Sequence, residues 1–384
     1  MISPAPRISR LTLTGFRNYA GLRLDVGDPL VALTGANGAG KTNLLEAISL
    51  LTPGRGLRGA GFEELARKGG AAAWAIAAEL DAQDAAVTLG TGWSGQTDGQ
   101  EGNARLVVID GHVQKSAGAL GSHMRQLWLT PAMDRLFAGP AGDRRRFMDR
   151  LVAAFDPEHA ARATVFEKVM RERNLLLEET RPDAAWLSSL EAHMAEAAVA
   201  MAAARVTALE ALQRHIDEGR RASAFPWGKL AIEGEIEARL ADTPAVRVED
   251  EYRRILGDSR RLDAAAGRTL RGPHRSDLSV IHGPKDMPAG LCSTGEQKAL
   301  LIGLILAQAR AVTVESRMAP VLLLDEVAAH LDRARRQDLF AALAALGCQA
   351  WMTGTDVELF GGLGREAAVF HVEAGTVSEV MERT

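Results

Sequence analysis

The sequence predicts an α/β fold in which one domain is built from both ends of the chain and is interrupted by a mainly helical lobe. Residues 8–130 carry the short alternating patterns of strands, residues 143–221 carry apolar residues at helical spacing, and residues 299–380 return to strands that alternate with helices. A length of 384 residues accommodates two compact units. The boundaries expected from these changes are 1–138 and 270–384 for the discontinuous head, and 139–269 for the lobe.

Composition narrows the class of protein before any motif is considered. Hydrophobic residues make up 47% of the chain, and the net charge of −4 means that any nucleic-acid binding must come from local basic clusters. Cys292 and Cys348 lie far apart without metal-ligand spacing, so we expect free thiols. No apolar run of about 18 residues is apparent, and Met1–Arg10 lacks the apolar core of a signal peptide. These features predict a cytoplasmic protein without a membrane span.

The amino-terminal part is expected to form strands joined by turns. Ile8–Leu13 alternates apolar and polar residues as a strand does, Gly15–Tyr19 turns the chain, and Leu22–Val26 forms a second, antiparallel strand. The short apolar run Leu30–Thr34 ends in a glycine-rich turn, and a helical pattern begins at Asn43–Ile48. Further strands are expected at Ala71–Leu80, Ala85–Gly90 and Arg105–Ile109, with a hairpin tip at Trp93–Asn103.

Two prolines, Pro157 and Pro182, divide the middle of the chain into several helices. Because heptads are not sustained, no long coiled coil is expected. Two apolar helix faces are expected, one from Val165, Val169 and Leu176, the other from Leu209, Leu212 and Ile216. The elements expected after the lobe are helices at Val248–Ala266, Ala299–Ala311 and Arg333–Leu346, strands at Val321–Leu324 and Gln349–Thr353, and a hairpin of Val369–Glu373 with Thr376–Val380.

The stretch Gly35–Thr42 reads GANGAGKT and matches the phosphate-loop pattern G-x-x-x-x-G-K-[ST] in full. Glycines let successive backbone N–H groups curl round a phosphate, and the start of the following helix adds a favourable dipole. Lys41 is expected to reach the β- and γ-phosphates of ATP and to act in catalysis, and Thr42 to hold Mg²⁺ through its hydroxyl. The residues expected to bind the nucleotide here are Gly35, Ala36, Asn37, Gly38, Ala39, Gly40, Lys41 and Thr42.

Four apolar residues, Val321–Leu324, lead directly into Asp325 and Glu326. A buried strand that delivers an aspartate to its carboxyl end is how the second Mg²⁺-orienting group reaches a nucleotide. Glu326 is then placed to polarise the attacking water. A strand that ends in two acids by chance is the alternative for this stretch taken alone.

A third loop, Cys292–Gln297, precedes a helix about 30 residues before the acidic strand. Ser293 and the N–H groups of the helix start suit a γ-phosphate. Taken alone, a serine at a helix start is more often a plain N-cap. Its position between the glycine loop and the acidic strand favours a role at the nucleotide.

Together the three stretches resemble the ATP site of the ABC-type ATPases, which implies a P-loop head of mixed sheets and helices. In that family the serine loop completes the site of a second subunit. The resemblance therefore implies an ATP-dependent homodimer in which Ser293 and Gly295 contact the nucleotide of the other copy. Asp332 stands where the family has its D-loop and is implied to lie at that interface, although an N-cap role would also explain it.

Further stretches resemble the RecF family over nearly the whole chain. The resemblance implies an ATP-driven, dimerising DNA-binding switch of recombinational repair that acts at single-strand gaps or duplex junctions and hydrolyses ATP slowly. It also implies RecR and RecO as partners and, indirectly, RecA. The stretches that carry it are Thr12–Tyr19, Gly35–Glu46, Gly139-Pro140 with Arg144–Asp149, and Gly272–Arg275.

The chain departs from the pattern of that family at two places. Ser276-Asp277 stands where the family has two acids, and the turn Pro131–Met133 lacks an acid that the family carries. The identity of the residues that sense the γ-phosphate therefore stays open. Gln126 is one candidate, and Thr353 or Thr355 is another where transporter ATPases have a histidine.

Arginine clusters recur along the chain and are candidates for contact with DNA phosphates. Because no aromatic residues are interleaved with them, the backbone of duplex DNA or of a duplex–gap junction is favoured over base stacking on single strands. Solvated helix faces that pair with the many glutamates are the alternative for each cluster. The residues expected to contact DNA are Arg55, Arg58, Arg144, Arg171 and Arg173.

Three other classes of protein share a phosphate loop. A P-loop kinase needs no serine loop that acts on a second subunit, and a transporter ATPase needs a coupling surface to a membrane partner. The head of another SMC-type chromosome-maintenance complex needs long coiled-coil arms. The serine loop and the short, arginine-rich lobe favour the DNA-binding switch, with the chromosome-complex head as the nearest alternative.

Overall fold

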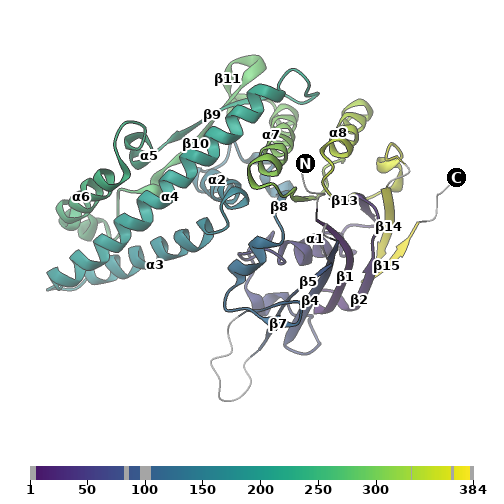
Figure 1. Ribbon diagram of the computed structural model, residues 1–384, viewed down its shortest axis with the longest axis horizontal. Helices are drawn as coiled ribbons and strands as arrows, with labels where there is room; N and C mark the ends of the chain where they lie inside the picture. The colour runs from purple at the N-terminus through teal and green to yellow at the C-terminus, as the bar shows by residue number, and fades with distance from the viewer. Residues whose placement is uncertain (1–5, 82–85, 96–104, 330, 365–366, 381–384) are drawn as a thin grey trace. The chain divides into compact units, whose positions relative to one another are not determined.

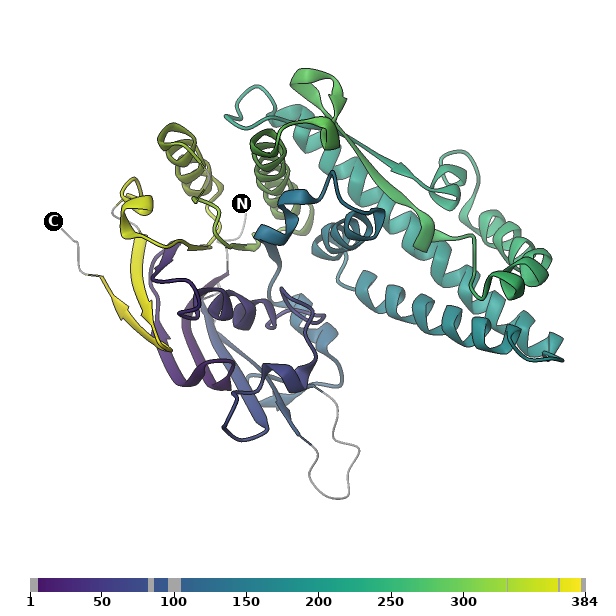
Figure 2. The ribbon, with the colours of Figure 1, turned by 180° about the vertical axis from the view of Figure 1, so that it is seen from behind.

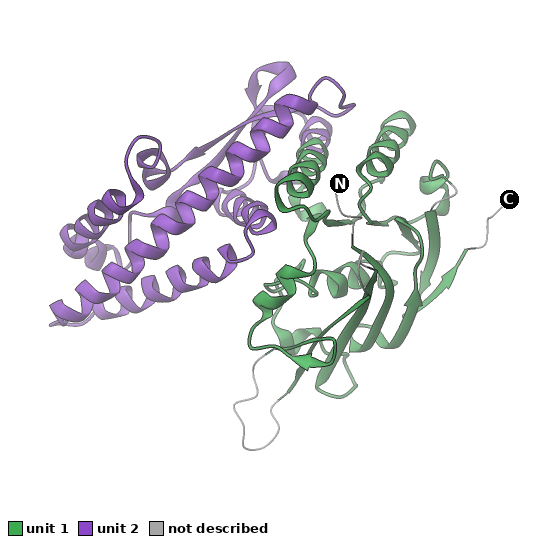
Figure 3. Cartoon of the chain, in the orientation of Figure 1, with its two compact units in different colours: residues 1–134, 301–384 green, residues 135–300 purple. Residues whose placement is uncertain are grey.

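The chain folds into two compact units, which Figure 3 colours separately. The computed structural model describes residues 6–81, 86–95, 105–329, 331–364 and 367–380. Unit 1 comprises Met1–Asp134 and Leu301–Thr384, and unit 2 comprises Arg135–Leu300. The first boundary lies close to the one proposed at residue 138, whereas residues 270–300 group with unit 2 and not with the head.

An antiparallel sheet forms one layer of unit 1 (Figure 1), with the strand order β2-β1-β4-β5-β6-β7. Its strands are β1 Arg7–Phe16, β2 Tyr19–Asp25, β4 Ala73–Asp81, β5 Val87–Ser94, β6 Leu106–Ile109 and β7 His112–Val113. Each strand predicted in this region is present. However, β5 extends through Trp93, which pairs with Trp74 of β4, so the predicted hairpin tip begins later than expected. The rest of that tip, residues 96–104, lies outside the described residues.

A second, mostly parallel sheet of unit 1 has the strand order β15-β14-β3-β13-β12-β8. Its strands are β3 Leu30–Thr34, β8 Gln126–Leu129, β12 Val321–Leu324, β13 Ala350–Thr353, β14 Ala367–Glu373 and β15 Thr376–Glu379. Only the pairing of β14 with β15 is antiparallel among the strands that the structure describes here. Every residue of β3, β12 and β13 is buried, as in a parallel sheet that is covered on both faces.

Helices cover both faces of the parallel sheet (Figure 1). Helix α1, Lys41–Ser49, lies on the face toward the antiparallel sheet, where Val31 and Leu33 of β3 share a core cluster with Leu44 of the helix. Helix α8, Arg333–Leu346, lies on the other face. Side chains along β3 alternate between the two faces of the sheet and pack into the core on each face. The glycine loop follows at the carboxyl end of the strand.

Helix α7, Thr294–Ser316, is longer at both ends than the sequence predicts. By length and composition alone it could cross a membrane, but 72% of its most apolar window is buried inside the fold. Such burial is typical of a core helix. The apolar run within this helix is interrupted by Lys298 and Arg310, so it stays shorter than 18 uninterrupted apolar residues.

Unit 2 combines helices with a small antiparallel sheet of strand order β11-β10-β9 (Figure 2). Its helices are α2 Ala141–Phe155, α3 His159–Leu177, α4 Ala184–Gly219, α5 Glu235–Arg239 and α6 Ala245–Ala266, and its strands are β9 Gly228–Glu233, β10 Asp277–His282 and β11 Met287–Pro288. Strand β10 pairs with β9 along its whole length, which accounts for the grouping of residues 270–300 with this unit.

Short 3₁₀ turns occur in both units. They lie at Phe62–Leu65, Ala117–Ser122, Pro131–Arg135, Pro273–Arg275, Gly283–Lys285, Ala289–Leu291 and Val357–Phe360.

The two prolines predicted to break the helical region do so: Pro157 lies between α2 and α3, and Pro182 between α3 and α4. The predicted face of α4 is buried as expected. On α3, however, Val165 is 49% exposed, so its assignment to the apolar face was wrong. The buried stripe of α3 instead includes Phe166, Val169 and, unexpectedly, Arg173.

Two stretches that resemble the RecF pattern lie together inside unit 2. Nε and Nη2 of Arg144 donate to the two carboxylate oxygens of Asp277, at 2.8 and 2.6 Å. Nε of Arg205 donates to Asp149 at 2.9 Å, and its Nη1 donates to the carbonyl oxygen of Pro273 at 2.8 Å. Burial alone would raise the pKa of Asp277, but the hydrogen bonds and charge of Arg144, together with the N–H of Leu278 and the charge of Arg145, lower it. These residues therefore hold helices α2 and α4 to the start of β10.

Candidate nucleotide-binding site

The glycine loop Gly35–Thr42 joins β3 to α1, in the strand–loop–helix order that the sequence predicts. Gly35, Gly38 and Gly40 have φ values of 136°, 82° and 119°, in the region that favours glycine. A Cβ atom on Gly35 would lie 2.3 Å from the carbonyl oxygen of Val372. The glycines thus permit a tight curve, and such a curve turns backbone N–H groups inward round a phosphate.

Lys41, the lysine of the glycine loop, is buried. Its Nζ donates to the carbonyl oxygens of Gly35 at 2.7 Å and Ala36 at 2.9 Å. Burial lowers the pKa of Lys41, while the negative charges of Glu326 and Asp325 oppose that shift. The ammonium group therefore stands between the loop and the acidic strand end, where it is able to donate to phosphate oxygens.

The acidic strand end meets the start of α1, as predicted for a magnesium site. Oγ1 of Thr42 donates to Oδ1 of Asp325 at 2.9 Å. A hydroxyl and a carboxylate in contact are the hard oxygen ligands that Mg²⁺ takes when substrate phosphates and water complete its shell. The donor set therefore fits this ion. Among the described residues, no cluster of three or more His, Cys, Asp or Glu side chains offers another metal site.

Glu326 follows Asp325 at the end of β12 and has an unusual backbone conformation. Its φ is 51°, in the left-handed region that few residues other than glycine adopt. Its N–H donates to Oγ1 of Thr353 at 2.8 Å, and that same hydroxyl donates to Asp325 at 2.7 Å. Both acidic residues are thus tied to the end of β13.

The turn between β1 and β2 supports the glycine loop. Nδ2 of Asn18 donates to the carbonyl oxygen of Ala39, and the hydroxyl of Tyr19 donates to that of Gly40, both at 3.0 Å. Nδ2 of Asn43 in α1 donates to Oδ1 of Asn18 at 2.8 Å. Sequence reasoning assigned no role to Asn18 or Tyr19, because contacts between residues 21 apart leave no local pattern.

The serine loop lies at the exposed start of α7, with Ser293 and Gly295 at the surface. The N–H of Ser293 donates to Oε2 of Glu296 at 3.0 Å, as in a capping box. The ion pair with Lys285 and the hydrogen bonds from Ser293 lower the pKa of Glu296 to about 2. The loop therefore has a fixed shape and an accessible serine, which is what contact with a second copy requires. That contact stays a prediction.

Asp332 is exposed and caps helix α8. Its Oδ1 accepts a hydrogen bond from the N–H of Arg335 at 2.8 Å. The N-cap role that the sequence left open is therefore present. An additional role at an interface is compatible with this geometry and stays a prediction.

Gln126 cannot sense a γ-phosphate, so that candidate is corrected. Its buried amide donates through Nε2 to the carbonyl oxygen of Ile48 at 2.7 Å and accepts from Oγ1 of Thr52 at 3.3 Å. Ile48 lies six residues beyond Thr42, roughly 9 Å along the axis of α1 and away from the glycine loop. Gln126 begins β8, whereas the site gathers at the carboxyl ends of the strands.

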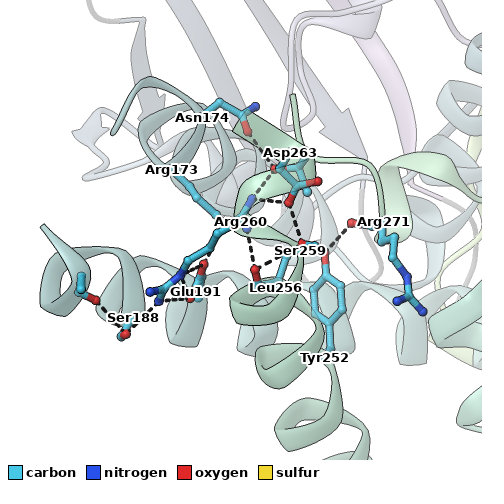
Figure 4. Close-up of polar contacts among 12 residues, drawn as sticks. Arg173, Asn174, Ser188, Glu191, Tyr252, Leu256, Ser259, Arg260, Asp263 and Arg271 are labelled. Carbon is cyan, nitrogen blue, oxygen red and sulfur yellow. Dashed lines mark hydrogen bonds and ion pairs between the residues drawn. The ribbon is translucent and has the colours of Figure 1, made fainter. Parts of the chain in front are cut away.

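The prediction that Arg173 contacts DNA is also wrong, because the side chain is fully buried. Its Nε donates to Glu191 at 3.1 Å, and its Nη1 donates to Asp263 at 2.8 Å. Nη2 donates to the carbonyl oxygen of Leu256 at 2.7 Å. Arg260 donates to both carboxylate oxygens of the same Glu191 (Figure 4). Arg173 therefore joins α3, α4 and α6 and offers no donor to a ligand.

The other predicted DNA contacts differ in how accessible they are. Arg144 is engaged with Asp277, and Nη1 of Arg58 donates to Asn43 and Glu46. Arg55, Arg58 and Arg171 are exposed. These three residues stay candidates for DNA contact, whereas Arg144 is half-buried and paired within unit 2.

A mostly parallel sheet with a glycine loop after β3 and two acids after β12, and a second sheet across α1, define the head of an ABC-type ATPase. A family model described as RecF/RecN/SMC N terminal domain matches residues 7–378. The chain is 53% identical over 371 residues to the DNA replication and repair protein RecF of Mesorhizobium japonicum, covering 96% of this chain and 97% of that protein. Its identity to the RecF protein of Rhizobium leguminosarum is 52% over 372 residues, covering 97% and 98%. The chain belongs to the RecF family.

Solved structures share this fold. The structure of the recombination mediator protein RecF-ATPrS in the RecFOR pathway matches with a TM-score of 0.83 and 23% identity, covering 99% of this chain and 100% of that one. An Smc head domain with an extended coiled coil from Pyrococcus furiosus matches with a TM-score of 0.52 and 16% identity, covering 98% and 96%. At these identities the likeness concerns the fold.

Proposed function

We propose that this chain is an ATP-dependent DNA-binding protein of recombinational repair, in which ATP brings two copies together on DNA and slow hydrolysis releases them. Membership of the RecF family supports this function. The proposed place of action is a single-strand gap or duplex junction in the cytoplasm. There the dimer helps RecR and RecO to load the recombinase RecA.

The contact between Thr42 and Asp325 carries the proposal, because it joins the glycine loop to the acidic strand end at hydrogen-bond distance. Backbone N–H groups of the loop and the ammonium of Lys41 bind the β- and γ-phosphates. A magnesium ion held by Thr42 and Asp325 would neutralise charge that develops on those phosphates. Glu326, next to Asp325, orients the attacking water.

The dimer is proposed from the accessibility of the serine loop. Ser293, Gly295 and Asp332 are exposed in one copy, so they are available to the nucleotide of another. Donors that reach the γ-phosphate only after two copies meet would make hydrolysis depend on assembly. Slow turnover by the separate chain follows from that requirement.

DNA binding is proposed to use exposed arginines, among them Arg55 and Arg171. With a net charge of −4, the chain attracts DNA through such local groups and not through its overall charge. Contacts to phosphates release counterions, so affinity falls steeply as salt rises. This dependence separates backbone binding from recognition of bases.

The test is DNA affinity measured with ATP, with ADP and without nucleotide, alongside sedimentation to follow the mass. We expect affinity and mass to rise together with ATP and with neither other condition. Lys41→Met should lose both effects, whereas Glu326→Gln should retain the ATP dimer. An ATP-independent affinity, or a monomer on DNA, would refute the switch.

The variant Ser293→Arg distinguishes ATP binding by a single chain from ATP-dependent dimerisation. It places a bulky cation at the exposed loop and leaves the glycine loop of the same chain intact. We expect ATP binding to persist while the dimer is lost. Dimerisation at wild-type strength would show that Ser293 does not complete the site of a second copy.

A further inference from the structure

The end of strand β13 lies at the centre of the candidate site. In the sheet β13 is flanked by β3, which leads into the glycine loop, and by β12, which leads into the two acids. Its last residue, Thr353, pairs in register with Leu33 and is fully buried. A side chain at this position is therefore close to both halves of the site without being exposed to solvent.

The hydroxyl of Thr353 makes two hydrogen bonds of opposite sense. It donates its only hydrogen to Oδ1 of Asp325 at 2.7 Å, and it accepts from the N–H of Glu326 at 2.8 Å. The same Oδ1 accepts from Thr42 at 2.9 Å. The carboxylate proposed to hold the metal ion is thus fixed from two directions, by α1 and by β13.

The second bond restrains a strained residue. Glu326 has a φ of 51°, which costs free energy for a residue with a Cβ atom and persists where the surroundings hold it. The Thr353 hydroxyl gives the Glu326 N–H an acceptor in that conformation. The direction in which the Glu326 side chain leaves the backbone therefore depends on Thr353.

We propose that Thr353 is a positioning residue for ATP hydrolysis, which sets the orientation of Asp325 and of Glu326 together. This role rests on the hydrolysis proposed above. It differs from direct contact with the γ-phosphate, because the hydrogen of the hydroxyl is already donated to Asp325 and the side chain is buried. Thr353 acts on the reaction through the two acids.

The variant Thr353→Val tests the hydroxyl, because it keeps the branched shape of the side chain but leaves the N–H of Glu326 without an acceptor and Asp325 without one donor. Loss of such an outer partner of a metal ligand reduces metal affinity or activity by about 10–100-fold. We expect Thr353→Val to lower kcat by about tenfold or more, and to raise the Mg²⁺ concentration that half-saturates ADP binding by a similar factor. ADP affinity in EDTA should stay within about twofold of wild type, because the glycine loop is unchanged.

Two variants guard against a merely structural explanation. Thr353→Ser retains the hydroxyl and should restore both readouts. Thr91→Val is the matched control in the same unit, because Oγ1 of buried Thr91 also donates once, to Leu106 at 3.0 Å, and accepts once, from Arg105 at 2.7 Å. Thr91→Val should leave kcat and the Mg²⁺ requirement unchanged.

The outcomes are distinct. Equal kcat and equal Mg²⁺ requirement in wild type and Thr353→Val would overturn the positioning role, as would a loss of ADP affinity in EDTA that matches the loss of kcat. A wild-type chain that binds ATP without hydrolysing it would refute the proposed function instead. In that case the Mg²⁺ titration of ADP binding still decides whether Thr353 positions Asp325.

Discussion

Replacement of Arg173 by leucine should destabilise unit 2 without any direct effect on ligand binding. Removing one partner of a buried ion pair costs about 3–5 kcal/mol, since the remaining charge is left uncompensated. Here Glu191 keeps Arg260, and Asp263 keeps donors from Ser259 and Leu270, which moderates that penalty. The carbonyl oxygen of Leu256 also loses the Nη2 donor, but it keeps the hydroxyl of Ser259 at 3.2 Å. We expect a net loss of about 3–4 kcal/mol in the free energy of unfolding.

Urea titration followed by helical circular dichroism measures this loss. With a slope of about 2 kcal/mol per molar urea, the midpoint should fall by about 1.5–2 M. Arg171→Leu is the matched control, because Arg171 lies two residues away on α3, is exposed, and donates to the backbone of its own helix. Its effect should stay within about 0.5 kcal/mol. Equal midpoints for the two variants would refute the assignment of Arg173 to a buried network.

Three further predictions concern the loop, the core of unit 2 and a thiol. Gly35→Ala should destabilise the protein more than Gly38→Ala, because an added Cβ meets the Val372 oxygen at 2.3 Å in the first case and nothing within 4 Å in the second; equal unfolding midpoints would contradict the close approach. A double-mutant cycle of Arg144→Ala with Asp277→Ala should give a coupling energy of about 1–3 kcal/mol, and a value near zero would show that the pair contributes no net stability. Burial raises the pKa of Cys348 to about 11, so the folded protein holds a neutral thiol below that pH and gains thiolate only above it. A thiolate-directed reagent should therefore modify Cys348 only after unfolding, and modification of the native protein at the rate of an exposed cysteine would contradict this.

Local sequence patterns predicted the main elements around the candidate nucleotide site, and predicted them in their correct order along the chain. The glycine loop, the strand Val321–Leu324 and the helix Arg333–Leu346 follow from spacing and apolar runs, and the structure has each of them. Both cysteines are free, as expected. The stretch Gly228–Glu233 alternates as a strand does, but no strand was predicted for the lobe. Because this strand, β9, pairs with β10, residues 277–282 belong to unit 2, and the boundary between the units differs from the predicted one.

Contacts between distant residues account for the errors. Arg171 and Arg173 have the same local surroundings in sequence, yet one is exposed and the other binds Asp263, 90 residues away. No sequence pattern near Arg173 indicates that Asp263 is its partner. Likewise, the role inferred for Thr353 depends on Asp325, 28 residues away, and on the order of strands in the sheet. Sequence spacing identifies a residue's chemistry, whereas its accessibility depends on the packing of the whole unit.

The discontinuous construction of unit 1 has a consequence for protein synthesis. The side chain of Gln349 binds the backbone N–H and carbonyl of Ile8 across 341 residues, and β3 is flanked by β13 and β14, which also come late in the chain. A ribosome that adds about 5–20 residues per second leaves the glycine loop without its neighbouring strands for about 20–70 s. Unit 2 is continuous and needs no such delay. A nascent chain therefore cannot form the nucleotide site until translation has passed Phe370, so a prematurely terminated product would emerge unable to respond to ATP.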